Sequence, residues 1–280
     1  MNFEEQVLTF RCGDAVMIGI AAIPEKPAQR GVLVVVGGPQ YRVGSHRQFL
    51  LLSRQLAEAG VPVLRFDYRG MGDSDGAIRT FEAVDDDIST AVDAFFQAVP
   101  SLREIVIWGL CDAASAALMY VGRDKRVSGL VLANPWVRTS QGMAKTMVKH
   151  YYGSRFLQRE FWQKLLSGKV DVFASARSLI GSVCSAMVKK KTPVGETLPF
   201  PERMALGLGG FAGPVLMMLS GQDLTAQEFE EMTKTSPAWQ RALKHPRLEW
   251  RRLEDATHTF STQAWRDQVG RWTIDWLKSW

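Results

Sequence analysis

One cysteine in the chain stands where a reactive side chain is expected. Cys111 follows the apolar run at residues 105–108 within Gly109-Leu110-Cys111-Asp112-Ala113, and more small residues come directly after it. An apolar run that ends in Gly-x-Cys before small residues is typical of a buried strand that turns sharply into a helix, presenting the central side chain to solvent. Because a cysteine thiolate is a strong nucleophile, we predict that Cys111 attacks an acyl carbon.

An aspartate and a histidine follow Cys111 in the order nucleophile, acid, base. Asp223 comes just after the apolar run 214–219, and His258 just after the strand-like run 248–253. Loops at the carboxyl ends of parallel strands converge on one crevice. His258 would take the proton of Cys111, and Asp223 would hold the histidine tautomer and stabilise the imidazolium. The sequence therefore predicts a Cys111-Asp223-His258 triad.

The alternatives for the base and the acid are placed less well. None of the other three histidines (His46, His150 and His245) follows a late strand. Asp255 competes for the role of acid, but it is three residues from His258 and is better placed to cap or solvate the loop. The position after the run 127–133, where some enzymes carry the acid, is Asn134.

Backbone N–H groups near Cys111 are candidates for the oxyanion hole. The first is the N–H of Asp112, the residue after the nucleophile. The second is expected in the turn Gly37-Gly38-Pro39-Gln40, where Pro39 has no N–H to donate. We therefore predict Gln40 as the donor, with Gly38 as the alternative. The other interpretation of Gly-Gly-Pro is a tight turn without a catalytic role.

The run Asp67-Tyr68-Arg69-Gly70-Met71-Gly72-Asp73-Ser74-Asp75 carries three carboxylates, which suggests a metal site at first sight. We interpret it instead as a structural loop in which Asp67 and Arg69 hold the sheet and the glycines permit tight turns. It is not a phosphate-binding loop, because the lysine that such loops require is absent. We expect neither a metal nor a cofactor.

The elements around these residues alternate between strand and helix, which predicts an α/β fold with a mostly parallel sheet flanked by helices. Residues 3–12 and 15–23 are expected to form a hairpin. Further strands are expected at 31–36, 61–66, 105–108, 127–133, 214–219 and 248–253, and helices at 45–59, 81–99 and 262–280, with another after Cys111.

The alternation stops after residue 135. We assign residues 136–213 to an inserted helical lid, and residues 1–135 and 214–280 to the core. From 137 to 191 the lid carries eleven Lys or Arg and only two acidic residues, whereas the whole chain has a net charge of +5. Such a basic segment would attract a phosphate-bearing substrate or an anionic membrane surface. A solvated helical face is the other interpretation.

Composition limits the class of protein. At 280 residues, 46% hydrophobic and 22% charged, the chain has an ordinary globular balance. Its three cysteines, Cys12, Cys111 and Cys184, have no metal-ligand or disulfide spacing, which favours a reducing compartment. We find no signal-peptide pattern and no long apolar window, so we expect a soluble, cytoplasmic protein. We expect no nucleic-acid partner, because the basic residues lack interleaved aromatics.

The motifs at residues 37–39, 67–74, 109–113 and 256–260 together resemble the α/β-hydrolase superfamily over most of the chain. More narrowly, the run Gly-Gly-Pro-Gln-Tyr-Arg-x-Gly-Ser-His at 37–46 is similar to the exosortase A system-associated hydrolase 1 group. This resemblance implies a bacterial acyl hydrolase or acyltransferase linked to exopolysaccharide and protein sorting. The chain departs from the superfamily pattern at the nucleophile, which is sulfur.

Three functions follow from these features. The first is an ester or thioester hydrolase that forms an acyl-cysteine. The second is an acyltransferase that passes the acyl group to a sugar, an amine or a carrier, because thioesters react more readily with amines and thiols than with water. The third is a non-catalytic binding module on the same fold. The basic lid favours an acyl group carried by CoA or an acyl-carrier protein.

Overall fold

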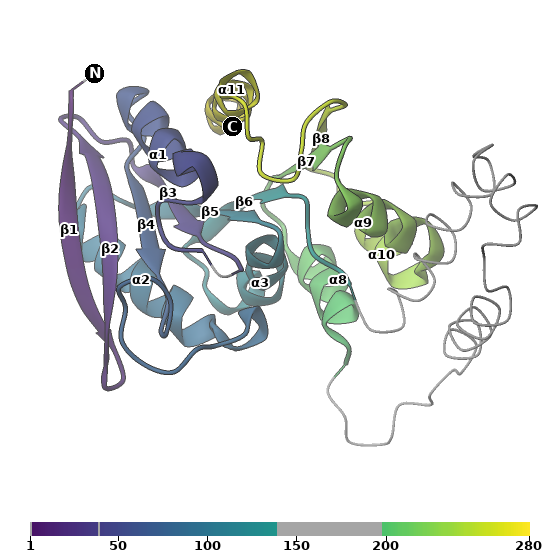
Figure 1. Cartoon of the computed structure of the whole chain (residues 1–280), viewed down its shortest axis with the longest axis horizontal. Coiled ribbons are helices and arrows are strands. Elements are labelled where there is room, and N and C mark those ends of the chain that lie inside the picture. The colour runs from purple at the N-terminus through teal and green to yellow at the C-terminus, as the bar shows by residue number, and fades with distance from the viewer. Residues whose placement is uncertain (1, 39, 139–197) are drawn as a thin grey trace, which may run out of the picture. The chain divides into compact units, whose positions relative to one another are not determined.

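An eight-stranded sheet forms the centre of the fold, as the computed structural model of residues 2–38, 40–138 and 198–280 shows (Figure 1). Its strand order is β1-β2-β4-β3-β5-β6-β7-β8. The strands β1 and β2 are antiparallel to their neighbours, and β3 to β8 are mutually parallel. The predicted α/β fold with a mostly parallel sheet is thus confirmed. The strands are β1 Phe3–Cys12, β2 Ala15–Pro24, β3 Arg30–Val35, β4 Val63–Asp67, β5 Glu104–Leu110, β6 Val127–Ala133, β7 Val215–Ser220 and β8 Leu248–Leu253.

Helices cover both faces of the sheet. Apolar residues of α1 and α11 pack on one face, and those of α2, α3, α8, α9 and α10 pack on the other. The helices are α1 Gln48–Glu58, α2 Asp85–Ala98, α3 Asp112–Tyr120, α8 Phe200–Gly210, α9 Leu224–Thr235, α10 Pro237–Ala242 and α11 Gln263–Leu277, with short 3-10 turns η1 Ser45–Arg47, η2 Phe81–Ala83 and η3 Val121–Arg123.

Burial on both faces explains the continuous apolar runs of the central strands. In β3, Val32 and Val34 pack towards α1 and α11, while Leu33 and Val35 pack towards the helices of the other face. Side chains of a strand alternate between the two faces, so both sets must be apolar. Burial on both faces therefore explains the β-branched run in the sequence.

The range predicted as a lid divides into two parts. Residues 139–197 lie outside the described residues. The remainder contains α8, and the compact unit that holds the sheet comprises residues 1–137 and 198–280. In α8, the side chains of Met204, Ala205 and Leu208 are buried in the main hydrophobic cluster. The core therefore resumes at residue 198 rather than at residue 214, because α8 buries its apolar side against the body of the protein.

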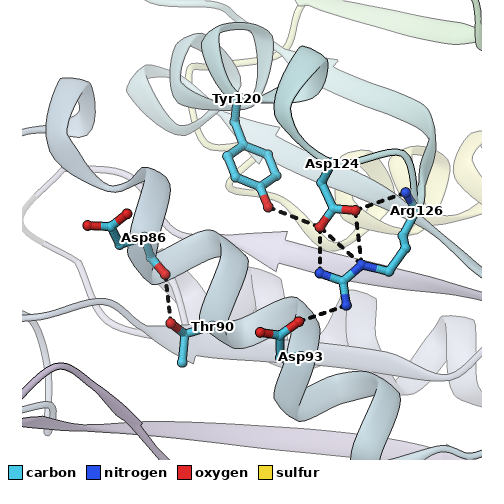
Figure 2. A network of polar contacts seen from close by, with 6 residues as sticks. All are labelled: Asp86, Thr90, Asp93, Tyr120, Asp124 and Arg126. Atoms are coloured by element: carbon cyan, nitrogen blue, oxygen red, sulfur yellow. Dashed lines mark hydrogen bonds and ion pairs between the residues drawn. The ribbon is translucent and has the colours of Figure 1, made fainter.

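A network of polar contacts joins α2 to the connection between α3 and β6 (Figure 2). The guanidinium of Arg126 donates to Asp124 at 2.6 Å and to Asp93 of α2 at 2.7 Å. The Tyr120 hydroxyl donates to Asp124 at 3.2 Å. These contacts lie at the end of the sheet opposite to the carboxyl ends of β5 and β6, so they stabilise the fold without approaching Cys111.

None of the helices within the described ranges has both the length and the apolar character that a membrane span requires.

Candidate active site

Cys111 lies at a sharp turn between β5 and α3. Its backbone adopts φ 62° and ψ −125°, a combination that is unfavourable for any residue other than glycine. The Cys111 N–H donates to the Ala133 carbonyl at 2.9 Å, and its own carbonyl accepts the Trp136 N–H at 3.2 Å. A Cβ atom on Gly109 would come within 2.7 Å of the Ala113 backbone. The small residues predicted around the cysteine therefore allow the strained turn, which leaves Cys111 half-buried.

Asp223 and His258 lie together at the ends of β7 and β8. The His258 Nδ1 is 2.8 Å from the Asp223 Oδ2. Asp223 is almost fully buried and also begins α9, where its carboxylate accepts the N–H groups of Thr225 at 3.1 Å and Ala226 at 3.2 Å. The helix therefore fixes the carboxylate that orients the histidine. Asp255, the competing acid, is exposed.

The Cys111 side chain is also close enough to the His258 ring to influence its protonation. Burial lowers the pKa of His258, but the hydrogen bonds to Asp223 and Cys111 and the attraction of their charges outweigh burial, raising this pKa to about 10. The three residues predicted as a triad are thus brought together, and the imidazole lies between a sulfur and a carboxylate. This arrangement suits proton transfer from the thiol to the ring.

The raised pKa of His258 predicts a pH-dependent stability. An unfolded histidine titrates near pH 6.5, whereas the folded ring titrates near 10. Because the folded-state pKa is the higher one, its stabilisation is fully present below pH 6.5 and is lost as pH rises through 10. Over this range the wild type should therefore lose unfolding free energy relative to His258→Gln. Urea unfolding at a series of pH values measures the difference, and parallel curves for the two proteins would contradict the assignment.

Asn134 is a positioning residue that the sequence interpretation did not identify. It is fully buried after β6, with φ 44°. Its Nδ2 donates to the Ser220 Oγ at 2.9 Å and to the His258 carbonyl at 3.0 Å, and its Oδ1 accepts the Ser220 N–H at 2.8 Å. The Ser220 hydroxyl donates in turn to the Thr257 carbonyl at 3.0 Å. Asn134 and Ser220 thus fasten the loop that carries His258. The only sequence signal was a polar residue at a strand end.

The oxyanion hole differs from the sequence prediction at Gly38. The Gly38 N–H, predicted as the alternative second donor, donates to the Asp112 Oδ2 at 2.9 Å and so has an internal acceptor. The Asp112 side chain reaches this turn, a contact that no local sequence pattern indicates. Gln40 uses its side-chain oxygen to accept the Ser45 N–H at 3.2 Å. Pro39 lies outside the described residues, and the role of the Gln40 N–H stays a prediction.

The acidic loop after β4 has structural contacts. Asp67 is buried, and its Oδ1 accepts the Arg42 N–H at 2.6 Å, while the Arg42 guanidinium pairs with Oδ2. Arg69 donates to the buried Asp87 of α2 at 2.7 Å. The loop thus links the turn after β3 to α2, in agreement with the structural interpretation.

Two of the remaining histidines lie within the described residues. The His245 Nε2 lies 2.9 Å from the Phe211 carbonyl. His46 belongs to η1 and has a positive φ of 51°. His150 lies outside the described residues. The geometry therefore brings His258, and neither His245 nor His46, to Asp223.

Comparisons with known proteins agree with this architecture. A model of the alpha/beta hydrolase family matches residues 32–271. The Pyrococcus furiosus esterase Pf2001 is 17% identical over 99% of this chain and 92% of that chain, with a TM-score of 0.67. Est1E from Butyrivibrio proteoclasticus, solved with ferulic acid, is 14% identical over 96% of this chain and 97% of that chain, with a TM-score of 0.61. No curated protein matches the sequence. At such low identities the solved structures show a shared fold alone.

Proposed function

The chain belongs to the alpha/beta hydrolase family, and from this premise we propose that it cleaves acyl esters or thioesters through a Cys111-His258-Asp223 triad with an acyl-cysteine intermediate. The observation that carries the proposal is the placement of His258. Its Nδ1 lies 2.8 Å from the Asp223 Oδ2, and the Cys111 side chain is close enough to the ring to raise its pKa. A histidine held between an acid and a thiol is the arrangement that activates a cysteine nucleophile.

The first half-reaction forms the acyl-enzyme. The Cys111 thiolate, with its proton on His258, attacks the carbonyl carbon of the substrate, and the carbonyl electron pair moves onto the oxygen. When the tetrahedral intermediate collapses, the bond to the leaving group breaks and His258 returns its proton to the leaving alcohol or thiol. Asp223 stabilises the imidazolium throughout.

The second half-reaction releases the acyl group. His258 takes a proton from a water molecule as that water attacks the thioester carbon, and the proton then returns to the Cys111 sulfur as it leaves. The products are a carboxylic acid and the free enzyme. An alcohol, amine or thiol in place of water would make the same chain an acyltransferase.

The acyltransferase is the second candidate, and two sequence features favour it. A thioester intermediate reacts with amines and thiols more readily than with water. The basic segment at 137–191, with eleven Lys or Arg against two acidic residues, would attract a phosphate-bearing carrier such as CoA or an acyl-carrier protein. Contact with an anionic membrane surface is another role for the same segment. The resemblance of residues 37–46 supports a link to exosortase and exopolysaccharide systems.

Covalent labelling tests the proposal. The protein is mixed with p-nitrophenyl butanoate and, separately, with butanoyl-CoA, then quenched in acid and analysed by intact mass and peptide mapping. We expect a butanoyl group on Cys111. Turnover of these donors with no adduct at any time of quenching contradicts the acyl-cysteine mechanism. A protein that neither turns over nor forms the adduct supports the binding module instead.

Added acceptors separate hydrolysis from transfer. A hydrolase should release butanoate at the same rate with and without glycerol, an amine or pantetheine. A transferase should turn over several times faster with its acceptor and form the acylated acceptor as the main product. Chromatography of the products distinguishes the two results.

A further inference from the structure

The carboxyl group of Asp112 lies inside the turn that was expected to hold the oxyanion. Its Oδ2 accepts the Gly38 N–H at 2.9 Å. Its Oδ1 lies against Gly37, where a Cβ atom on that residue would overlap it. The carboxyl is also close enough to the Asp112 N–H for that group to favour its charged form. Both the Gly38 N–H and the Asp112 N–H, two of the predicted oxyanion donors, therefore interact with an acidic group of the protein itself.

The surroundings of this carboxyl disfavour a negative charge. Its Oδ1 is buried and has no hydrogen-bond partner among the described residues. Burial raises the pKa of Asp112 above its ordinary value, and the N–H groups of Gly38 and Ala113, together with the charge of His258, offset only part of that effect. The carboxyl is thus a group whose protonation state depends on what charge develops beside it.

Tyr68 is buried and interacts electrostatically with the carboxyl. Burial, followed by the charge of Asp112, raises the pKa of Tyr68 to about 12, so its hydroxyl stays neutral at physiological pH. His258 is the cationic group that acts on Asp112. During attack, however, the positive charge of His258 also serves the reacting sulfur and Asp223. The Asp112 carboxyl therefore depends on the same positive charge, that of His258, as the catalytic groups do.

We propose that Asp112 is a specificity-determining residue, which restricts the enzyme to activated acyl donors, in particular thioesters. This inference rests on the proposed function. An oxyanion at the Asp112 N–H would compete with the Asp112 carboxyl for donors and, when that carboxyl is ionised, would meet its negative charge. A weakened oxyanion hole lowers the rate most for donors that depend on it most. Oxygen esters are resonance-stabilised and need that help, whereas thioesters have a more electrophilic carbonyl.

The reaction step affected is the first attack. The Cys111 sulfur forms a bond to the carbonyl carbon, and the carbonyl electron pair becomes the oxyanion. The carbon–sulfur bond of a thioester donor then breaks, and the leaving thiolate takes the proton held by His258. No further reactant is needed. Asp112 changes the free energy of forming the oxyanion, and it makes or breaks no bond itself.

A pair of matched donors tests this role. Ethyl butanoate and S-ethyl thiobutanoate carry the same acyl group and the same alkyl chain, and kcat/KM reports acylation by each. In Asp112→Asn and Asp112→Ala, we expect kcat/KM for the ester to rise relative to the thioester by on the order of tenfold, as removal of one neighbouring charge implies. Ionised Asp112 should favour the thioester most, and Asp112→Asn should lack this contribution at every pH.

Alkylation by iodoacetamide separates an effect on the oxyanion from an effect on the sulfur. It occurs at a saturated carbon and forms no oxyanion. We expect the Asp112 variants to change alkylation of Cys111 much less than ester acylation. Asp93→Asn, which removes an acidic group from the surface of α2, is the matched control and should keep the wild-type selectivity (Figure 2).

The outcomes are distinguishable. The proposal is wrong if the folded variants keep the wild-type ratio of ester to thioester rates, or if alkylation and ester acylation rise by the same factor. If neither donor ever acylates Cys111, the proposed function itself fails. An acyl-Cys111 adduct with unchanged selectivity overturns the role of Asp112 alone.

Discussion

Replacing Cys111 by alanine should abolish the acyl adduct and lower kcat/KM by roughly 10⁴-fold or more, the scale of loss when a triad nucleophile is removed. The triad acts as a unit, because His258 has no proton to take when the sulfur is absent. The fold should survive, since alanine is smaller than cysteine and the backbone strain at φ 62° is similar for both residues. Steady-state kinetics with p-nitrophenyl butanoate and intact mass spectrometry measure both effects.

A second cysteine provides the matched control. Cys12, at the end of β1, is also a free thiol and is buried. Cys12→Ala should keep the adduct and the turnover of the wild type. Cys111→Ser retains a side chain of similar size but loses the readily ionised sulfur, and its turnover should also fall. Wild-type turnover in Cys111→Ala would show that the reaction does not pass through this residue.

Asp223→Asn should lower kcat/KM by about 10²- to 10⁴-fold and should destabilise the protein less than Asp223→Ala does. An asparagine amide can present an N–H to Nδ1 of His258, which would place the ring proton on the nitrogen facing Cys111. The ring could then no longer accept the thiol proton. The asparagine oxygen can still accept the Thr225 N–H, but the NH2 that faces His258 replaces the oxygen that accepted the Ala226 N–H. Helix α9 should therefore keep one of its two N-terminal contacts.

Asp223→Ala separates the two roles of this carboxylate. It removes the contacts at the start of α9 as well as the partner of His258, so it should also destabilise the protein by about 1 kcal/mol. Urea unfolding of the three proteins measures the stability, and parallel kinetics measure the catalytic loss. The dual role is refuted if Asp223→Asn is as active as the wild type, or if Asp223→Ala is as stable as Asp223→Asn.

The elements that position the site could be predicted from the sequence because their signals are local. The run at 31–36 was expected as a strand and forms β3 at Arg30–Val35, since burial on both faces demands continuous apolar residues. The turn at Cys111 was visible because only small residues tolerate its close backbone contacts. The order of Asp223 and His258 after two late strands then indicated their proximity.

Other features depend on contacts that no local pattern records. The Asp112 carboxyl reaches Gly38, which is 74 residues away, and this follows from the direction of one side chain at the start of α3. Asn134 fastens the loop of His258 from 124 residues away. Helix α8 was assigned to the lid because a helix without a neighbouring strand signal gives no indication of which body buries its apolar side.

The backbone conformation at Cys111 presents the nucleophile but lowers the stability of this protein. A residue other than glycine in that conformation costs about 1 to 3 kcal/mol, and the conformation at φ 62° and ψ −125° is held by hydrogen bonds to neighbouring loops. Selection for heat resistance alone would therefore favour glycine at position 111 and delete the sulfur. A population evolved for stability without a demand for activity is expected to lose its nucleophile while keeping its fold.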